Sequence, residues 1–130
     1  VTGVQTCALP IYYEKIELLL RDYFKAVGNA DIVRLKTIFH EQAAMYGYLG
    51  NDAVVGTPDI FFADLSSKPS MQSQGIDCRM VIKNISVAGN TAQAAIFVDN
   101  FFGAFQIEDF FHLLKVNGEW KIVCKTFTTL

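Results

Sequence analysis

The stretch Asp109–Phe127, DFFHLLKVNGEWKIVCKTF, holds two apolar-rich segments on either side of Asn117-Gly118. An Asn-Gly pair between two such segments is the strongest short-range signal of a β-hairpin, because both residues accept positive φ angles. Upstream, apolar residues alternate over Ile76–Val87, Gly89-Asn90 makes a turn, and Thr91–Phe102 returns as the next strand. The second half of the chain therefore predicts a four-stranded antiparallel meander. A change of apolar phase near Lys83-Asn84 predicts a β-bulge in its first strand.

The first half of the chain is predicted to be mainly helical. Apolar residues recur at helical spacing over Tyr12–Val27, and Gly28-Asn29 ends this predicted helix. Asp31 is a suitable N-cap for a second, shorter helix that reaches Phe39. Two short strands, at 44–49 and 53–55, and a third helix that begins at Thr57-Pro58 follow before the meander.

The eleven N-terminal residues, VTGVQTCALPI, differ from the rest of the chain. They resemble a translated sequencing adapter, and no initiator Met precedes the periodic sequence from Tyr12 onward. We interpret residues 1–11 as an artefactual leader, with a natural disordered arm as the alternative. Residues 12–130 are then expected to form one domain. An authentic N-terminus would be missing, so the compartment is left open, cytoplasmic by default.

Composition narrows the function classes. Apolar residues make up 52% of the chain, and no apolar run approaches the roughly 18 residues of a membrane-spanning helix. The net charge is −2 and the basic residues are scattered, which argues against nucleic acid as a partner. No nucleotide-binding or metal-ligand spacing is found, so neither a cofactor nor a metal is expected.

The order of predicted elements resembles the nuclear transport factor 2-like superfamily, in particular its polyketide-cyclase-like, or putative lumazine-binding, branch. The stretch from Asp109 through Trp120 is similar to that branch's pattern of D-[YF]-x-x-L-L-K-V-x-G-x-W. The resemblance implies an α+β fold in which a curved antiparallel sheet wraps on three N-terminal helices to form a cone. Such a cone keeps a pocket at one end, which we take as the default functional site.

The register of the last hairpin decides which of its side chains point inward, toward that pocket, and which point outward. A two-residue Asn117-Gly118 loop would place apolar and charged side chains together on both faces of the hairpin. A three-residue loop, 116–118, separates them better, and we adopt it. It turns Cys124 and five proposed ligand-binding residues inward: Phe110, His112, Leu114, Trp120 and Ile122. It turns Phe111, Leu113 and Val123 outward beside three lysines, Lys115, Lys121 and Lys125, where the apolar residues would form a homodimer interface of the kind common in this superfamily. Asp109 also faces outward by alternation, where it would pair with a lysine or a loop amide.

Ketosteroid-isomerase-like members of the superfamily suggest catalytic positions. The resemblance places Tyr23 at their oxyanion-binding Tyr, Gly47 at their catalytic carboxylate and His112 at their second acid. The base is therefore absent from this sequence. Tyr23 faces the pocket from the long helix and is a candidate for ligand binding, although it also fits a core role.

Three functions remain open. The first is a protein that binds a small hydrophobic or aromatic molecule in an aromatic-lined pocket. The second is a lyase, isomerase or cyclase that uses His112 and Tyr23 as catalytic residues. The third is an interaction domain with a vestigial pocket. The missing carboxylate favours the first, so whether the protein is an enzyme stays undecided.

Overall fold

A computed structural model describes residues 9–130 of the chain. The interpretation of residues 1–11 as a leader stays a prediction, and residues 1–8 of that segment lie outside the described residues. Three helices and six strands follow one another: α1 (Pro10–Asn29), α2 (Ile32–Ile38), β1 (Phe39–Leu49), β2 (Asp52–Gly56), α3 (Asp59–Ser66), β3 (Arg79–Ala88), β4 (Thr91–Phe101), β5 (Phe105–Val116) and β6 (Glu119–Thr129). Within the described part, no helix combines the length and apolarity needed to cross a membrane.

The helices form for the local reasons seen in the sequence. α1 starts at Pro10, two residues before the predicted start, because proline suits the first turn, where no backbone donor is needed. The Asp31 side chain accepts a hydrogen bond of 3.1 Å from the Arg34 backbone N–H and thereby caps α2, as predicted. Ala30, in the left-handed conformation, makes the tight link between the two helices.

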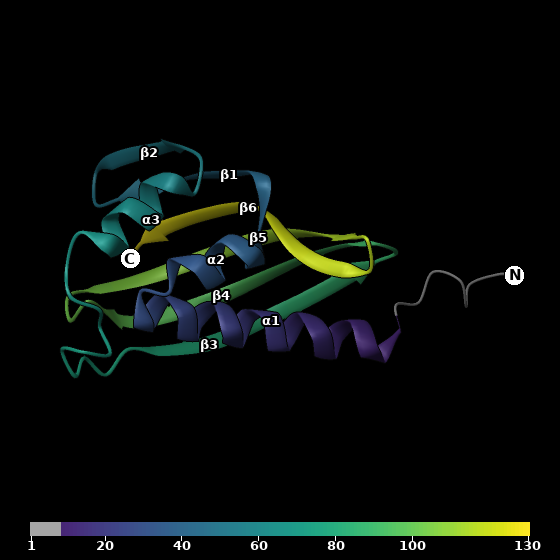
Figure 1. The fold of residues 1–130 in the computed structure, drawn as a ribbon, viewed down its shortest axis with the longest axis horizontal. Helices are drawn as coiled ribbons and strands as arrows, with labels where there is room; N and C mark the ends of the chain where they lie inside the picture. The colour runs from purple at the N-terminus through teal and green to yellow at the C-terminus, as the bar shows by residue number, and fades with distance from the viewer. Residues whose placement is uncertain (1–8) are drawn as a thin grey trace, which may run out of the picture.

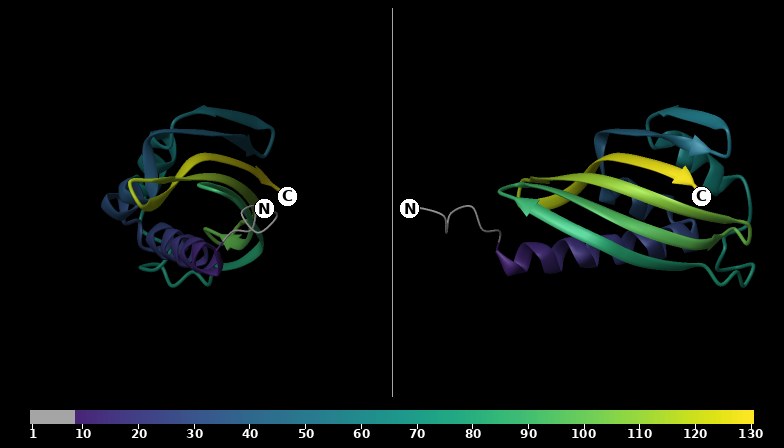
Figure 2. Two further views of the ribbon diagram at one scale, coloured as in Figure 1. Left: turned by 90° about the vertical axis from the view of Figure 1, so that its right-hand side faces the viewer. Right: turned by 180° about the vertical axis from the view of Figure 1, so that it is seen from behind.

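The six strands form one curled sheet in the order β2-β1-β6-β5-β4-β3. All neighbours are antiparallel except β1 and β6, which run parallel. Figure 1 shows α1 lying along the sheet, and the end-on view in Figure 2 shows the sheet curving around it. The expected α+β cone and its meander are confirmed, as is the bulge in β3, where the register shifts between Ile82 and Asn84.

The predicted loop of the last hairpin is wrong. Val116 pairs with Glu119, so the connection is the two-residue Asn117-Gly118 turn, with φ angles of 51° and 81°. This turn was rejected in the sequence analysis because it would mix apolar and charged side chains on both faces of the hairpin. A bulge in β6 removes that difficulty. Leu113 pairs with Ile122 whereas His112 pairs with Cys124, so Val123 is left without a partner in β5. The extra residue reverses the facing of β6 beyond it.

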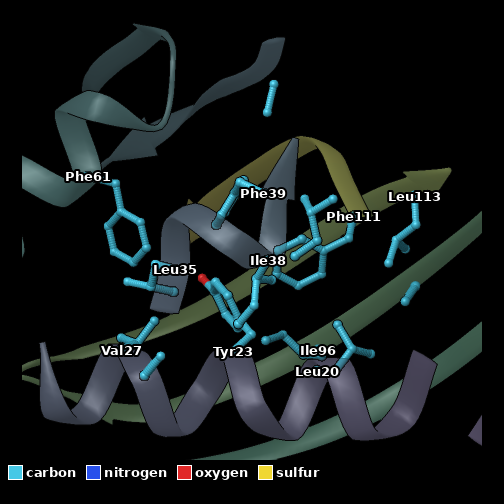
Figure 3. Close-up of a cluster of buried hydrophobic side chains, with 14 of the residues drawn as sticks. Leu20, Tyr23, Val27, Leu35, Ile38, Phe39, Phe61, Ile96, Phe111 and Leu113 are labelled. Atoms are coloured by element: carbon cyan, nitrogen blue, oxygen red, sulfur yellow. The ribbon is translucent and has the colours of Figure 1, made fainter. Parts of the chain in front are cut away.

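The facing of β5 is consequently the reverse of the prediction. Phe111 and Leu113 are fully buried against the helices, and Figure 3 shows both in the core with Tyr23 of α1. Phe110, His112 and Leu114 lie on the outer face, where Phe110 is 47% exposed and Leu114 39%. On β6, Trp120 and Ile122 do point inward, as expected.

Candidate functional site

A cavity of about 190 Å³ lies between α1, α3 and the sheet. Its wall is mostly apolar and includes Val27, Met45, Phe61, Val98, Ile107 and Phe127. Leu49, at the end of β1, and Ile60, in α3, also line the cavity and are exposed, so the cavity opens to solvent near these two residues. The curvature of the sheet keeps this space open, because the C-terminal half of α1 covers only part of the concave face.

Two charged side chains face the cavity from the sheet. Asp109 on β5 is 3% exposed and Lys125 on β6 is 5% exposed. Asp109 pairs with Phe127 and Phe111 pairs with Lys125, so the two charged residues are diagonal neighbours on one face. Their Oδ1 and Nζ atoms are 3.9 Å apart, which permits ionic attraction but is too long for a hydrogen bond. Asp109 Oδ1 has no hydrogen-bond partner in the described part of the chain.

Burial works against the charge on both groups. It raises the pKa of the Asp109 carboxyl, an effect that Lys125 opposes and Glu108 reinforces. It lowers the pKa of the Lys125 ammonium, with Asp109 opposing. The Lys125 Nζ also lies 3.8 Å from the centre of the Phe61 ring. Such a cation–π contact is worth about 0.5–2 kcal/mol, whereas removing an ion from water costs several kcal/mol, so desolvation decides the direction.

Tyr23 contributes the third polar group. Its ring packs edge-to-face on Phe111 and Phe39 with centroid distances of 5.1 and 6.0 Å. Figure 3 shows its hydroxyl directed away from α1 toward Phe61. Burial, and secondarily the Asp109 charge, raises the pKa of Tyr23 well above its usual range. The hydroxyl therefore stays protonated and can donate a hydrogen bond to a ligand.

Gly47 is the residue that the resemblance to ketosteroid-isomerase-like proteins places at the position of the catalytic carboxylate. A Cβ atom at this position would collide with the backbone carbonyl oxygen of Phe127, the residue that pairs with Gly47 across β1 and β6, and would lie 2.5 Å from Cδ1 of its ring. No side chain fits there unless Phe127 moves. Among residues 9–130, no three His, Cys, Asp or Glu side chains gather into a group able to hold a metal ion.

The sequence model of one family, described as putative lumazine-binding, matches residues 12–128. The chain belongs to this family. Its fold recurs in a nuclear transport factor 2-like protein of unknown function from Shewanella baltica, which is 29% identical, with a TM-score of 0.79 and coverage of 100% of this chain and 98% of the other. A similar protein from Methylobacillus flagellatus is 26% identical, with a TM-score of 0.82 and coverage of 96% and 97%.

A third relative in structure is the ketosteroid isomerase-like protein from Erwinia carotovora atroseptica. It is 18% identical, has a TM-score of 0.69, and the match covers 94% of this chain and 98% of the other, so the likeness extends to the fold alone. No curated protein compared with the chain matches it.

In this family member, one predicted site residue lines the cavity, namely Tyr23. His112, Phe110 and Leu114 are on the opposite face of the sheet, so the predicted pair of His112 and Tyr23 cannot act on one ligand. Trp120 and Ile122 are buried, but they lie outside the cavity. Trp120 packs on Tyr12, 5.5 Å between ring centroids. Tyr12 lies eleven residues before Tyr23, roughly 16 Å along the helix.

Sequence reasoning missed Asp109 and Lys125, which it had turned outward. Two signals pointed to them. The Asn117-Gly118 pair itself favours a two-residue turn, and the adjacent apolar residues Ile122 and Val123 break the alternation of β6 as a bulge does. Together, these signals would have placed Lys125 on the face of Trp120 and Ile122.

Proposed function

We propose that this chain binds a small, mostly apolar molecule whose polar group reaches Tyr23, Asp109 and Lys125. The observation that carries the proposal is the unpartnered Asp109 Oδ1 at the wall of an apolar cavity. Buried polar atoms without a hydrogen-bond partner are uncommon, and a ligand that donates to Asp109 would satisfy this one. The apolar wall would supply most of the affinity, and the three polar groups would orient the ligand.

The volume limits the ligand to about one ring. An apolar cavity of about 150 Å³ accepts benzene, whereas pockets for drug-sized ligands occupy about 300–1,000 Å³. The present cavity, of about 190 Å³, is closer in volume to the one that accepts benzene. A four-ring steroid is too large, and Gly47 provides no base, so we expect no steroid-isomerase turnover.

Two single-ring probes test the proposal. Toluene presents only apolar surface, whereas benzamide adds an amide that can donate to Asp109 and accept from Tyr23. Both should shift the methyl resonances of Val98 and Ile107 in the cavity wall. Tyr23→Phe should weaken benzamide about tenfold, the loss of one hydrogen bond, and should leave toluene unchanged.

His112→Leu is the matched control, because His112 is on the outer face and should affect neither probe. The proposal fails if neither probe shifts the cavity methyls. The assignment of Tyr23 fails if both variants bind benzamide like the wild type.

An enzyme of the isomerase or cyclase type is the second candidate. It is favoured by the presence of Tyr23 and Asp109 in one cavity, because raised pKa values favour the protonated form of each group, which can donate a hydrogen bond to a developing oxyanion. The empty base position at Gly47 argues against it. The third possibility, an interaction domain with a vestigial pocket, is less well supported, because the cavity is present and has polar groups on its wall.

A further inference from the structure

Lys125 has an unusual environment for an amine. Its Nζ is surrounded by the rings of Phe61, Phe127 and Tyr23, at 3.8, 5.3 and 5.7 Å from their centres. Asp109 is the ionic partner found for it among the described residues, at 3.9 Å. The amine thus faces the cavity with little water-exposed surface, and no direct hydrogen bond to it is found among the described residues.

The other seven lysines, all within the described residues, do not line this cavity. Lys68 and Lys83 pair with the carboxylates of Asp64 and Glu108 at exposed or half-exposed positions. Lys121, four residues before Lys125 on β6, donates a hydrogen bond of 2.5 Å to the Thr37 carbonyl oxygen. Such surface ammonium groups remain in contact with water.

We propose that Lys125 forms an imine with an aldehyde or ketone of about one ring in size that enters the cavity. The proposal rests on the proposed function, because the carbonyl compound must first occupy the apolar space. It adds the chemical class of the ligand and a covalent bond to one atom of the protein, Nζ of Lys125.

The reaction balances with the two buried groups and no oxidant or reductant. The neutral amine attacks the carbonyl carbon, a C–N bond forms, and the carbonyl oxygen takes the proton of the Asp109 carboxyl group. The nitrogen returns a proton to Asp109, and the hydroxyl group then leaves as water with that proton. The products are a protonated imine, water and the Asp109 carboxylate, so the net charge of the pair stays zero throughout.

The direction of both pKa shifts supports this assignment. Burial lowers the pKa of Lys125, which increases the fraction of nucleophilic amine at neutral pH. Burial raises the pKa of Asp109, which increases the fraction of its protonated form and so its ability to give a proton to the carbonyl oxygen. Tyr23 also faces the amine and stays neutral, and Asp64 at the cavity edge is exposed beside Lys68.

Trapping with benzaldehyde and cyanoborohydride at pH 7 tests the proposal. Reduction of the imine fixes one benzyl group on the attacking nitrogen, which intact mass detects and peptide mapping locates. The wild type should acquire one benzyl group on Lys125 at least about tenfold faster than on Lys121, because the cavity holds the aldehyde beside Nζ of Lys125. Excess benzyl alcohol, which has similar shape and no carbonyl group, should suppress labelling of Lys125 and leave the surface lysines unaffected.

Lys125→Met should lose the fast adduct, and Lys121→Met should retain it. Mapping and competition in the wild type keep the test decisive if Lys125→Met does not fold. Labelling spread evenly over the surface lysines would overturn the imine proposal. If benzyl alcohol still shifts the methyl resonances of Val98 and Ile107 in that case, the proposed binding function survives. If it does not, both proposals fail.

Discussion

The burial of Lys125 and Asp109 costs folding stability, and the same burial gives the cavity its two charged groups. A buried pair compensates its own desolvation only in part, and removing one partner leaves the other without compensation. Lys125→Met should therefore reduce the free energy of unfolding at pH 7 by roughly 3–5 kcal/mol, because Asp109 is left alone in an apolar site. Urea unfolding measures this loss.

The pH dependence of that loss has a definite sign. Without Lys125, nothing opposes the effect of burial, so the folded-state pKa of Asp109 rises further above its unfolded value of about 4. Between these two pKa values the folded state binds more protons than the unfolded state, so stability increases as the pH falls. Lys125→Met should recover stability from pH 7 to pH 5 relative to the double variant Lys125→Met/Asp109→Asn. Equal pH profiles for the two variants would contradict the assignment.

At the scale of elements, the parallel pairing of β1 with β6 depends on Gly47. The backbone carbonyl oxygen and the ring of Phe127 occupy the space of a side chain at this position, and Phe127 also forms part of the cavity wall. Gly47→Ala should cost about 1–3 kcal/mol through overpacking and should also weaken binding of toluene. Thermal unfolding and titration measure the two effects.

Gly28 supplies the control for this substitution. It lies near the end of α1, and a Cβ atom added there would contact nothing within 4 Å. Gly28→Ala should raise stability by about 0.5–1 kcal/mol, because alanine restricts the unfolded chain and favours the helix. A Gly47→Ala variant as stable as the wild type would show that Phe127 moves aside at little cost.

At the scale of the whole molecule, the outer face of the sheet is the remaining feature to explain. Phe110, Leu114 and Val81 are exposed on it. The prediction of a dimer through this face was first based on Phe111, Leu113 and Val123, of which Phe111 and Leu113 are in fact fully buried. We retain the homodimer as a proposal on the residues that do face outward.

Phe110→Glu tests the homodimer, because this exposed position accepts a charge without unfolding the chain. It should convert a dimer into a monomer in sedimentation equilibrium, since an unpaired charge at the core of an interface is unfavourable. Val33→Glu, on the exposed side of α2, should leave the dimer intact. A wild-type chain that sediments as a monomer at high micromolar concentration would refute the proposal. Leu113→Glu is not informative, because a buried charge there would unfold the protein.

Local signals in the sequence determined the helices, the meander, the capping by Asp31 and the bulge in β3. Each depends on residues close together in the chain, whose spacing and turn chemistry act wherever the segment lies. The family match follows from the same order of elements.

The candidate site was decided only in the tertiary structure. In the segment DFFHLLK, apolar residues occupy both phases of the strand, so alternation alone does not distinguish the inner face from the outer. The bulge at Val123 settles the facing of β6. The adjacent apolar pair Ile122-Val123 indicates a bulge in the sequence, and the pairing with β5 locates the extra residue at Val123. Asp109, Lys125 and Tyr23 come from two strands and a helix far apart in sequence. Only the folded sheet places them around one cavity, where burial shifts their pKa values.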